Sequence, residues 1–197
     1  VGNYPSNDKV SQSDKVHATS LIARNFSVND FLLKTETPLI SGVDTRALVR
    51  YLTANTKNHL FVITNKENAP AANEFSADKL YCNELSRVSQ AKPEVWRDGA
   101  NPIVVLNYGI KKEIMRELSA LGYPLVALPY NSSASEVLSY HPRLIFLSNG
   151  PGDPRVYSDQ VKVVRELFAS NVPIRAICLG HQLISLALGA EVCKLPF

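Results

Sequence analysis

The stretch Pro173-Ile-Arg-Ala-Ile-Cys-Leu-Gly-His-Gln-Leu-Ile184 predicts a buried strand, a sharp turn that carries Cys178, and then a helix. Gly180 relieves crowding just after the turn. A nucleophile at such a turn is held at the carboxyl edge of a sheet, where the helix N-terminus offers free N–H groups. These groups favour a thiolate and can stabilise an oxyanion. Cys178 is therefore a candidate nucleophile; the alternative is a buried, unreactive cysteine.

The chain around this stretch alternates short apolar runs with helical patterns. Strands are expected at 103–106, 125–128, 144–147 and 174–177, and the helical patterns between them cover 110–121, 134–138 and 161–168. Continuous apolar strands that alternate with helices indicate βαβ units and a parallel sheet covered on both faces. The fold class is therefore α/β, and a ligand site is expected beyond the carboxyl ends of the strands.

A second loop falls at the same edge of the predicted sheet. The sequence Ser148-Asn-Gly-Pro-Gly-Asp-Pro154 follows the third strand directly, and it lacks side chains at Gly150 and Gly152. Such a backbone can lie close to a ligand or donate N–H groups to an oxyanion. The alternative is an ordinary tight turn, but two loops that reach one edge favour a site.

The first half of the chain predicts a smaller mixed α/β domain. Asp44 is a plausible N-cap for a helix that runs to about Leu52, with Leu48, Val49, Tyr51 and Leu52 on its packed side. Other candidates are a helix that begins near Ser27, a strand at 61–64 and a helix at 76–89. A segment rich in Lys, Pro, Glu, Arg, Asp and Gly at 91–101 is predicted to be a linker. The predicted domains are 1–98 and 99–197.

Composition narrows the classes of function. The 197 residues carry a net charge of +3 with both signs interspersed, which argues against nucleic acid as the main partner. No apolar stretch approaches the roughly 20 residues that span a bilayer, and no leader-like segment is visible, so a cytoplasmic protein is expected. The three cysteines form no C-x-x-C pair, which favours free thiols and predicts no metal site. None of the four histidines is well placed as a general base for Cys178.

Two blocks are specific enough to suggest a family. Leu147-Ser-Asn-Gly-Pro-Gly-Asp-Pro154 and Ile177-Cys-Leu-Gly-His-Gln-Leu183 together resemble the class I (triad) glutamine amidotransferase domain. The block Gly42-Val-Asp-Thr-Arg-Ala-Leu48 and the stretch Leu106-Asn-Tyr-Gly-Ile-Lys-Lys112 make the resemblance closer to the small, glutamine-hydrolysing subunit of carbamoyl-phosphate synthetases. The resemblance covers essentially the whole chain. It implies an amino-terminal small-subunit domain followed by a doubly wound amidotransferase domain.

The resemblance also implies a chemistry and a set of partners. A cysteine thiolate attacks the side-chain amide of glutamine, expels ammonia and leaves a glutamyl thioester that water hydrolyses. Cys178 matches the nucleophile, Gly150 and Gly152 match backbone contacts to glutamine, Leu179 matches the oxyanion donor, and Gln182 matches a side chain that holds glutamine. This subunit needs no cofactor. A large subunit would receive the ammonia and use ATP, Mg and bicarbonate to make carbamoyl phosphate for arginine and pyrimidines.

The sequence departs from the family pattern in three ways. Ala176 stands where the family has glycine, the family's catalytic His and Glu lie beyond Phe197, and a serine-bearing segment precedes the equivalent of Val1. We therefore expect a fragment that lacks both ends, with an incomplete sheet and little glutaminase activity by itself. Another triad amidotransferase subunit and a non-catalytic docking or regulatory module are the alternatives.

Overall fold

The computed structural model describes residues 3–4, 18, 20–26, 37–55 and 84–193. The chain divides into two compact units, Val1–Cys82 and Asn83–Phe197. Among the described residues, no helix is both long and apolar enough to cross a membrane.

Unit 2 is built on a five-stranded sheet. Its strands are β5 (Glu94–Arg97), β6 (Ile103–Asn107), β7 (Leu125–Pro129), β8 (Leu144–Leu147) and β9 (Ile174–Ala176), in the order β5-β7-β6-β8-β9. All neighbouring pairs are parallel except β5 and β7. The central strands are apolar, apart from Asn107 at the end of β6, because helices bury both of their faces.

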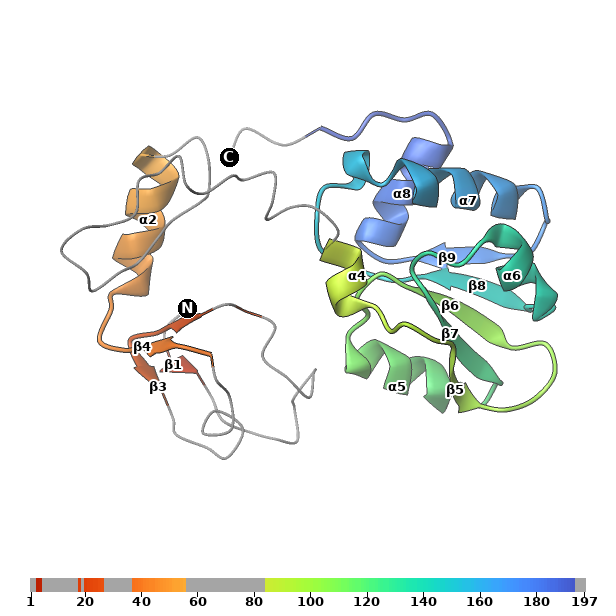
Figure 1. Cartoon of the computed structure of the whole chain (residues 1–197), viewed down its shortest axis with the longest axis horizontal. Coiled ribbons are helices and arrows are strands. Elements are labelled where there is room, and N and C mark those ends of the chain that lie inside the picture. The colour runs from red at the N-terminus through yellow and green to blue at the C-terminus, as the bar shows by residue number, and fades with distance from the viewer. Residues whose placement is uncertain (1–2, 5–17, 19, 27–36, 56–83, 194–197) are drawn as a thin grey trace. The chain divides into compact units, whose positions relative to one another are not determined.

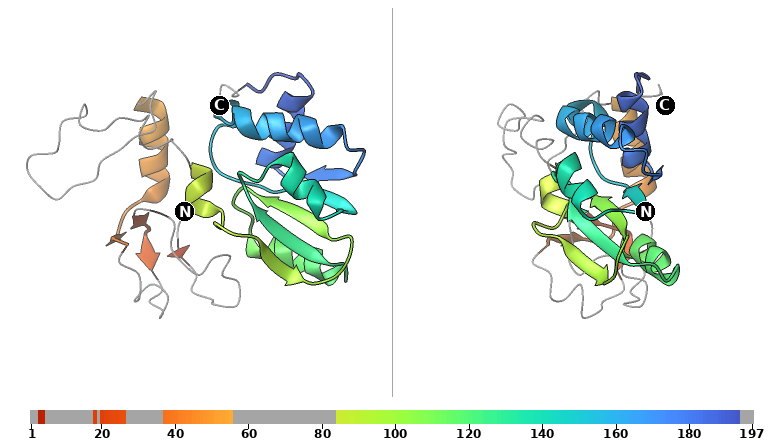
Figure 2. Two further views of the ribbon diagram at one scale, coloured as in Figure 1. Left: turned by 45° about the vertical axis from the view of Figure 1, so that its right-hand side comes forward. Right: turned by 90° about the vertical axis from the view of Figure 1, so that its right-hand side faces the viewer.

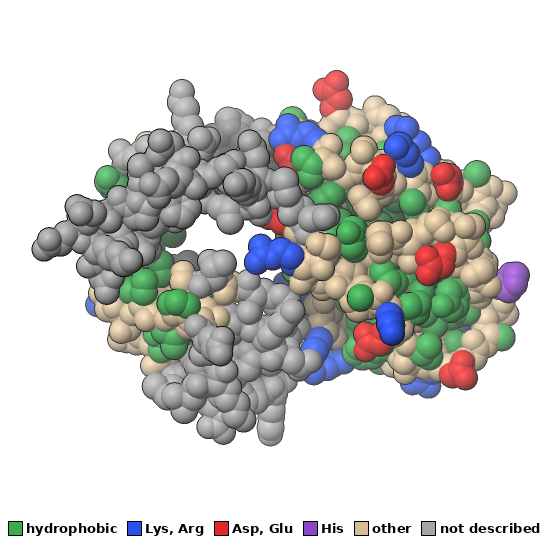
Figure 3. Space-filling model, in the orientation of Figure 1, with side chains coloured by type: hydrophobic (Ala, Val, Ile, Leu, Met, Phe, Trp, Pro, Cys, Tyr) green, Lys and Arg blue, Asp and Glu red, His purple; other side chains and the backbone are tan. Residues whose placement is uncertain are grey.

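Five helices and one short 3-10 helix belong to unit 2: α4 (Glu84–Val88), α5 (Lys112–Ala120), α6 (Ala134–Ser139), η3 (Pro154–Val156), α7 (Ser158–Phe168) and α8 (Leu179–Ala187). Helix α5 covers one face of the sheet, whereas α6, α7 and α8 cover the other (Figure 1, Figure 2). The α/β fold predicted from the sequence is confirmed. Acidic and basic side chains are interspersed on the face of unit 2 that Figure 3 shows.

The register of the sheet places the ends of three strands side by side. Leu106 of β6 pairs with Leu147 of β8, and Leu147 pairs in turn with Ala176 of β9. The segments that follow these strands therefore leave the sheet at one edge, the carboxyl edge. The four strands predicted from the apolar runs are present, and so are the helices expected between them.

The structure differs from the sequence prediction at the expected linker. Residues 91–101 include β5, which pairs antiparallel with β7 with a register shift between Val95 and Arg97. The two units divide after Cys82 and not at the predicted boundary of 98/99. The strand was missed because Glu94-Val-Trp-Arg97 has mostly exposed side chains at a sheet edge, so it carries no apolar run.

Strand β9 also differs from its prediction as a buried strand. Ile174 and Ala176 are half-buried, and Arg175 between them is exposed. In the described sheet β9 has one hydrogen-bonded neighbour, β8. Its side chains are accordingly less covered than those of β6 and β7.

Unit 1 contains short parallel strand pairs and one helix among its described residues. Strand β1 (Asn3–Tyr4) pairs with β3 (Asn25–Phe26), and β2 (Leu21–Ile22) pairs with β4 (Leu39–Ile40). Helix α2 (Thr45–Asn55) follows. The helix predicted near Ser27 and the strand at 61–64 lie outside the described residues, as does the part of the predicted helix 76–89 that precedes α4.

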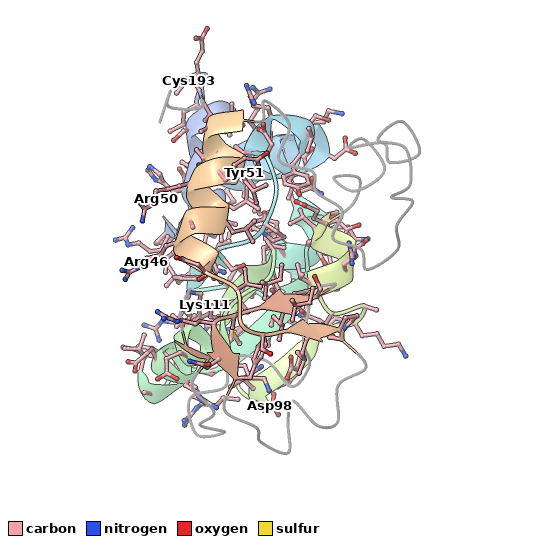
Figure 4. The ribbon with its side chains drawn as sticks, turned by 90° about the vertical axis from the view of Figure 1, so that its left-hand side faces the viewer. Arg46, Arg50, Tyr51, Asp98, Lys111 and Cys193 are labelled. Atoms are coloured by element: carbon pink, nitrogen blue, oxygen red, sulfur yellow. The ribbon has the colours of Figure 1, made fainter. Side chains whose placement is uncertain are left out.

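The predicted cap of α2 is confirmed. The Asp44 carboxylate accepts hydrogen bonds from the backbone N–H groups of Ala47 (3.0 Å) and Arg46 (3.1 Å). These bonds, Ala47 foremost, lower the pKa of Asp44 together with the charges of Arg24 and Arg50. The predicted packed side of α2 is only partly right, because Val49 and Tyr51 are 51% and 66% exposed. Arg46 and Arg50, one turn apart, project from the helix in Figure 4.

Candidate active site

Ser148 ties together the segments that leave β6, β8 and β9. Its hydroxyl accepts a hydrogen bond from the Tyr108 N–H at 2.9 Å and donates to the Asn149 carbonyl at 2.8 Å. Its own carbonyl accepts from the Gly180 N–H at 3.1 Å. The residue is fully buried. One residue therefore links the two predicted site loops and the turn after β6, through its hydroxyl on one side and its backbone carbonyl on the other.

Cys178 occupies the sharp turn that the sequence predicted between β9 and α8. Its backbone has φ 50° and ψ −111°, a region that a residue with a side chain rarely adopts. The residue is exposed and its thiol is free. This geometry lifts the sulfur out of the sheet edge at the N-terminus of α8, as expected of a nucleophile elbow. Cys178 is therefore not the buried cysteine of the alternative interpretation, and its role as a nucleophile stays a prediction.

Gly180 allows α8 to start tightly against β8. A Cβ atom at this position would collide with the Leu147 carbonyl oxygen and would lie 2.7 Å from the Leu147 carbonyl carbon. The absence of a side chain lets the Gly180 N–H reach the carbonyl of Ser148. The crowding that the sequence predicted at Gly180 is therefore confirmed, and its source is the backbone of β8.

Two residues of α8 that the sequence singled out flank the thiol. Leu179 is the first residue of α8, so its N–H has no acceptor within the helix. It follows the nucleophile directly, which is where an elbow places an oxyanion donor. Gln182 is half-buried, and its N–H bonds to the Cys178 carbonyl at 3.0 Å. Gln182 therefore lies in the first turn of α8, directly after the thiol-bearing turn.

The loop after β8 packs its glycines against other parts of the site. A Cβ at Gly150 would collide with the Tyr108 carbonyl oxygen and lie 2.8 Å from Leu179 Cδ2. Gly152 has φ +90°, and a Cβ there would collide with the Tyr157 hydroxyl and lie 2.6 Å from Glu84 Oε2. Both positions require glycine, one because of a close approach and the other also because of its backbone angle. The loop is thus a shaped backbone surface beside Cys178.

Polar side chains fix the two ends of this loop. Asn149 Nδ2 donates to the Gly109 carbonyl at 2.9 Å. Asn107 Oδ1 accepts from the N–H groups of Gly109 and Ile110, both at 2.8 Å, and Asn107 Nδ2 donates to Gln90. At the far end, Asp153 pairs with Arg155 at 2.5 Å. Neither Ser148 nor Asn149 was predicted to have this role, although both stand in the quoted motif.

Burial perturbs two tyrosines next to the loop. Burial raises the pKa of Tyr108 far above its usual range, and its hydroxyl has no hydrogen-bond partner among the described residues. Burial first, and then the charges of Glu84 and Asp153, raise the pKa of Tyr157 to about 12. The Tyr157 hydroxyl donates to the Pro151 carbonyl at 3.2 Å. Both phenols therefore remain protonated at neutral pH.

Neither described histidine of unit 2 is placed to act as a general base for Cys178. His141 precedes β8 and so lies at the amino edge of the sheet, opposite Cys178. His181 is exposed on the first turn of α8. Within the described ranges, no three His, Cys, Asp or Glu side chains are arranged to hold a metal ion. The chemistry that this geometry offers is that of a thiol nucleophile beside backbone N–H donors.

Comparison with known proteins identifies this arrangement. A family model described as glutamine amidotransferase class-I matches residues 104–197, which contain both site loops. The second half of the chain thus matches the class-I glutamine amidotransferase family. The resemblance read from the two motifs is confirmed, and so is the parallel sheet that the family implies.

The whole chain is also similar to proteins named carbamoyl phosphate synthase small chain. The chain is 33% identical to the one from Caldanaerobacter subterraneus, over 100% of its length and 56% of the relative's. It is 31% identical to the one from Methanosarcina mazei, over 100% of its length and 60% of the relative's. A pyrimidine-specific small chain from Lactiplantibacillus plantarum is 32% identical, with 57% of its length covered. The chain thus spans little more than half the length of these curated relatives.

Proposed function

We propose that this chain is the glutamine-binding and thioester-forming part of a carbamoyl-phosphate synthetase small subunit. The observation that carries the proposal is Cys178, an exposed thiol at φ 50° on the N-terminus of α8, inside a matched amidotransferase domain. Similarity over the whole chain, including the first unit, favours this over a triad amidotransferase of another pathway. The exposed thiol also favours an enzyme over a docking module.

The proposed reaction begins with attack of the Cys178 thiolate on the side-chain amide carbon of glutamine. The carbonyl oxygen takes up the negative charge, and the Leu179 N–H at the start of α8 donates to it. The tetrahedral intermediate collapses, the carbon–nitrogen bond breaks, and ammonia leaves with a proton from the medium or from an acid group. Water then attacks the thioester, releases glutamate and restores the thiol.

Glutamine is proposed to lie along the loop after β8. The backbone of Gly150 and Gly152 supplies polar groups without side chains in the way. Gln182, whose N–H bonds to the Cys178 carbonyl in the first turn of α8, offers a side-chain amide that can both donate to and accept from the substrate. No cofactor is assigned to this chain. The backbone and amide groups named here are neutral, so they suit an uncharged side-chain amide.

Among the described residues, neither histidine of unit 2 is positioned as a general acid or base for the proton-transfer steps. His141 lies at the opposite edge of the sheet and His181 is exposed beside the helix. A positioned general acid or base contributes about 10²–10⁴-fold to a rate. We therefore propose that this chain alone hydrolyses glutamine slowly, although it carries the nucleophile Cys178 and the Leu179 N–H as an oxyanion donor.

The proposed partner is a large synthetase subunit in a cytoplasmic heterodimer. It would take the ammonia and use ATP, Mg and bicarbonate to form carbamoyl phosphate for arginine or pyrimidine synthesis. The name of one relative, a pyrimidine-specific small chain, supports the second of these uses. Addition of a large subunit to this chain is expected to raise ammonia release from glutamine.

A labelling experiment tests the proposal without requiring turnover. The probe is a chloroketone analogue of glutamine, in which a chloromethyl ketone replaces the amide. A Cys178 thiolate forms a sulfur–carbon bond with it, the carbon–chlorine bond breaks and chloride leaves, while the thiol proton goes to the buffer. We expect saturable labelling at Cys178, protection by glutamine, and loss of labelling in Cys178→Ser.

Cys193→Ser is the matched control, because Cys193 is a second exposed free thiol. It should keep the saturable labelling and the protection. Labelling that does not saturate, that glutamine does not prevent, or that moves with Cys193 would contradict the proposal.

A further inference from the structure

We infer that Tyr157 is a positioning residue for the glutamine site, because its hydroxyl holds the Pro151–Gly152 peptide in the one orientation that presents the Gly152 N–H to a ligand. The inference rests on the proposed function. Tyr157 lies outside both motifs by which the family was recognised. The hydroxyl of Tyr157 bonds to the loop after β8 and not to α8.

The first step is the type of turn at Gly150-Pro-Gly-Asp153. Proline at the second position and glycine with φ +90° at the third match a type II turn. A type I turn has nearly the same path but the opposite orientation of the central peptide, with φ near −90° at the third position. Glycine adopts both signs of φ readily. By itself, the Pro151–Gly152 peptide could therefore turn over.

The second step is the hydrogen bond that selects one orientation. The Tyr157 hydroxyl donates to the Pro151 carbonyl at 3.2 Å, and the Tyr157 residue is 7% exposed. The Pro151 carbonyl and the Gly152 N–H belong to one planar trans peptide, so they point in opposite directions. Because the carbonyl points inward to Tyr157, the N–H points outward. Gly152 itself is exposed.

The third step is that this donor stays available. Burial and the nearby Glu84 charge keep the Tyr157 phenol protonated at neutral pH. Glu84 Oε2 lies on the same inner side of Gly152, where an added Cβ would lie 2.6 Å from it. A carboxylate there would repel an inward-turned carbonyl that had lost its donor. Without the hydroxyl, the turned-over peptide would place the Gly152 N–H toward Glu84 and away from the ligand.

Tyr157→Phe removes the hydroxyl and keeps the ring. A net hydrogen bond of the ordinary size corresponds to a change of about 2- to 10-fold in binding. We therefore expect the half-saturation concentration of the chloroketone analogue to rise by about 2- to 10-fold. The maximal labelling rate and the rate of Cys178 with iodoacetamide, which needs no glutamine pocket, should not change. A purely structural defect would change the iodoacetamide rate as well.

The peptide can also be observed directly, because Pro151-Gly152 is the one Pro-Gly pair in the sequence. Labelling with ¹³C-carbonyl proline and ¹⁵N-glycine gives a single correlated NMR signal for this peptide. We expect the carbonyl shift to move upfield in Tyr157→Phe, as it does when a carbonyl loses a hydrogen bond. Tyr140→Phe, at the end of α6 and away from the site, should leave both the signal and the labelling unchanged.

The unchanged protein provides a measurement that does not depend on a variant. Amide exchange at Gly152 should be fast, because its N–H faces outward, and slow exchange would overturn the inference. An unmoved carbonyl signal in Tyr157→Phe, or an unmoved half-saturation concentration, would also overturn it. If the unchanged chain shows no saturable labelling at all, the proposed function fails, while the NMR signal and the exchange rate still decide whether Tyr157 orients the peptide.

Discussion

The turn after β9 and the loop after β8 both contain a residue with a positive φ angle, but the residue differs between them. Both need a positive φ at the edge of the sheet, and the loop uses Gly152 at +90° whereas the turn uses Cys178 at +50°. Such a conformation costs a residue with a side chain about 1–3 kcal/mol. Glycine avoids that strain where backbone alone is needed. The turn keeps the strain because the chemistry needs a sulfur atom there.

The two regions also differ in what lies behind them. Gly180, which supports the turn, is backed by the carbonyl group of Leu147 at the end of β8, a strand paired on both sides. Gly152 is backed by the ends of two side chains, Tyr157 and Glu84. Backbone within a sheet cannot give way, whereas the ends of side chains can move aside by rotation about their own bonds. The thiol is therefore held more rigidly than the loop.

The largest expected effect is that of Gly180→Ala. The added methyl group would collide with the Leu147 carbonyl, so we expect the free energy of unfolding to fall by about 3 kcal/mol. Helix propensity alone predicts the opposite sign, since alanine favours a helix over glycine by about 1 kcal/mol. Denaturant unfolding of the variant decides between them. A stability equal to or above that of the unchanged chain would contradict a rigid support.

A smaller effect is expected for Gly152→Ala, about 2 kcal/mol, from backbone strain plus contact with yielding side chains. Gly122→Ala is the matched control, because Gly122 has φ +80° and nothing within 4 Å of an added Cβ. The free energy of unfolding of Gly122→Ala should fall only by the cost of the backbone strain, about 1 kcal/mol. Equal losses for the two variants in the same unfolding assay would show that Tyr157 and Glu84 do not crowd this glycine.

The smallest effect has the opposite sign. Cys178→Gly should stabilise the chain by about 1 kcal/mol relative to Cys178→Ala, because glycine releases the strain while both variants lack the thiol. Thermal unfolding of the pair, measured side by side, gives the difference. If the alanine variant is the more stable, the turn is not strained. The turn and the loop would then share a positive φ but not its energetic cost.

The sequence was sufficient to predict the parts that depend on local pattern. The apolar runs at 103–106, 125–128 and 144–147 predicted strands because both faces of those strands are buried. The position of Cys178 followed from a strand, a small residue two positions later, and a helix pattern. The cap at Asp44 was predicted because Asp44 precedes a stretch with apolar residues at helical spacing.

The parts that were missed depend on contacts between distant residues. Ser148 contacts residues 40 positions before it and 32 after it, and no periodicity reveals such a link. The Tyr157 bond to Pro151 requires knowledge of how η3 folds back under the loop. Val49 and Tyr51 were assigned to a packed side of α2 from their apolar character, yet large apolar residues are often exposed.

Strand β5 has a consequence for the behaviour of the chain in concentrated solution. A sheet edge offers unpaired N–H and carbonyl groups to which another chain can add a strand. Here the edge strand has four residues, is charged at both ends by Glu94 and Arg97, and shifts register after Val95. A short, charged and irregular edge is a poor template for a further strand, so this side of the sheet is protected against amyloid-like growth.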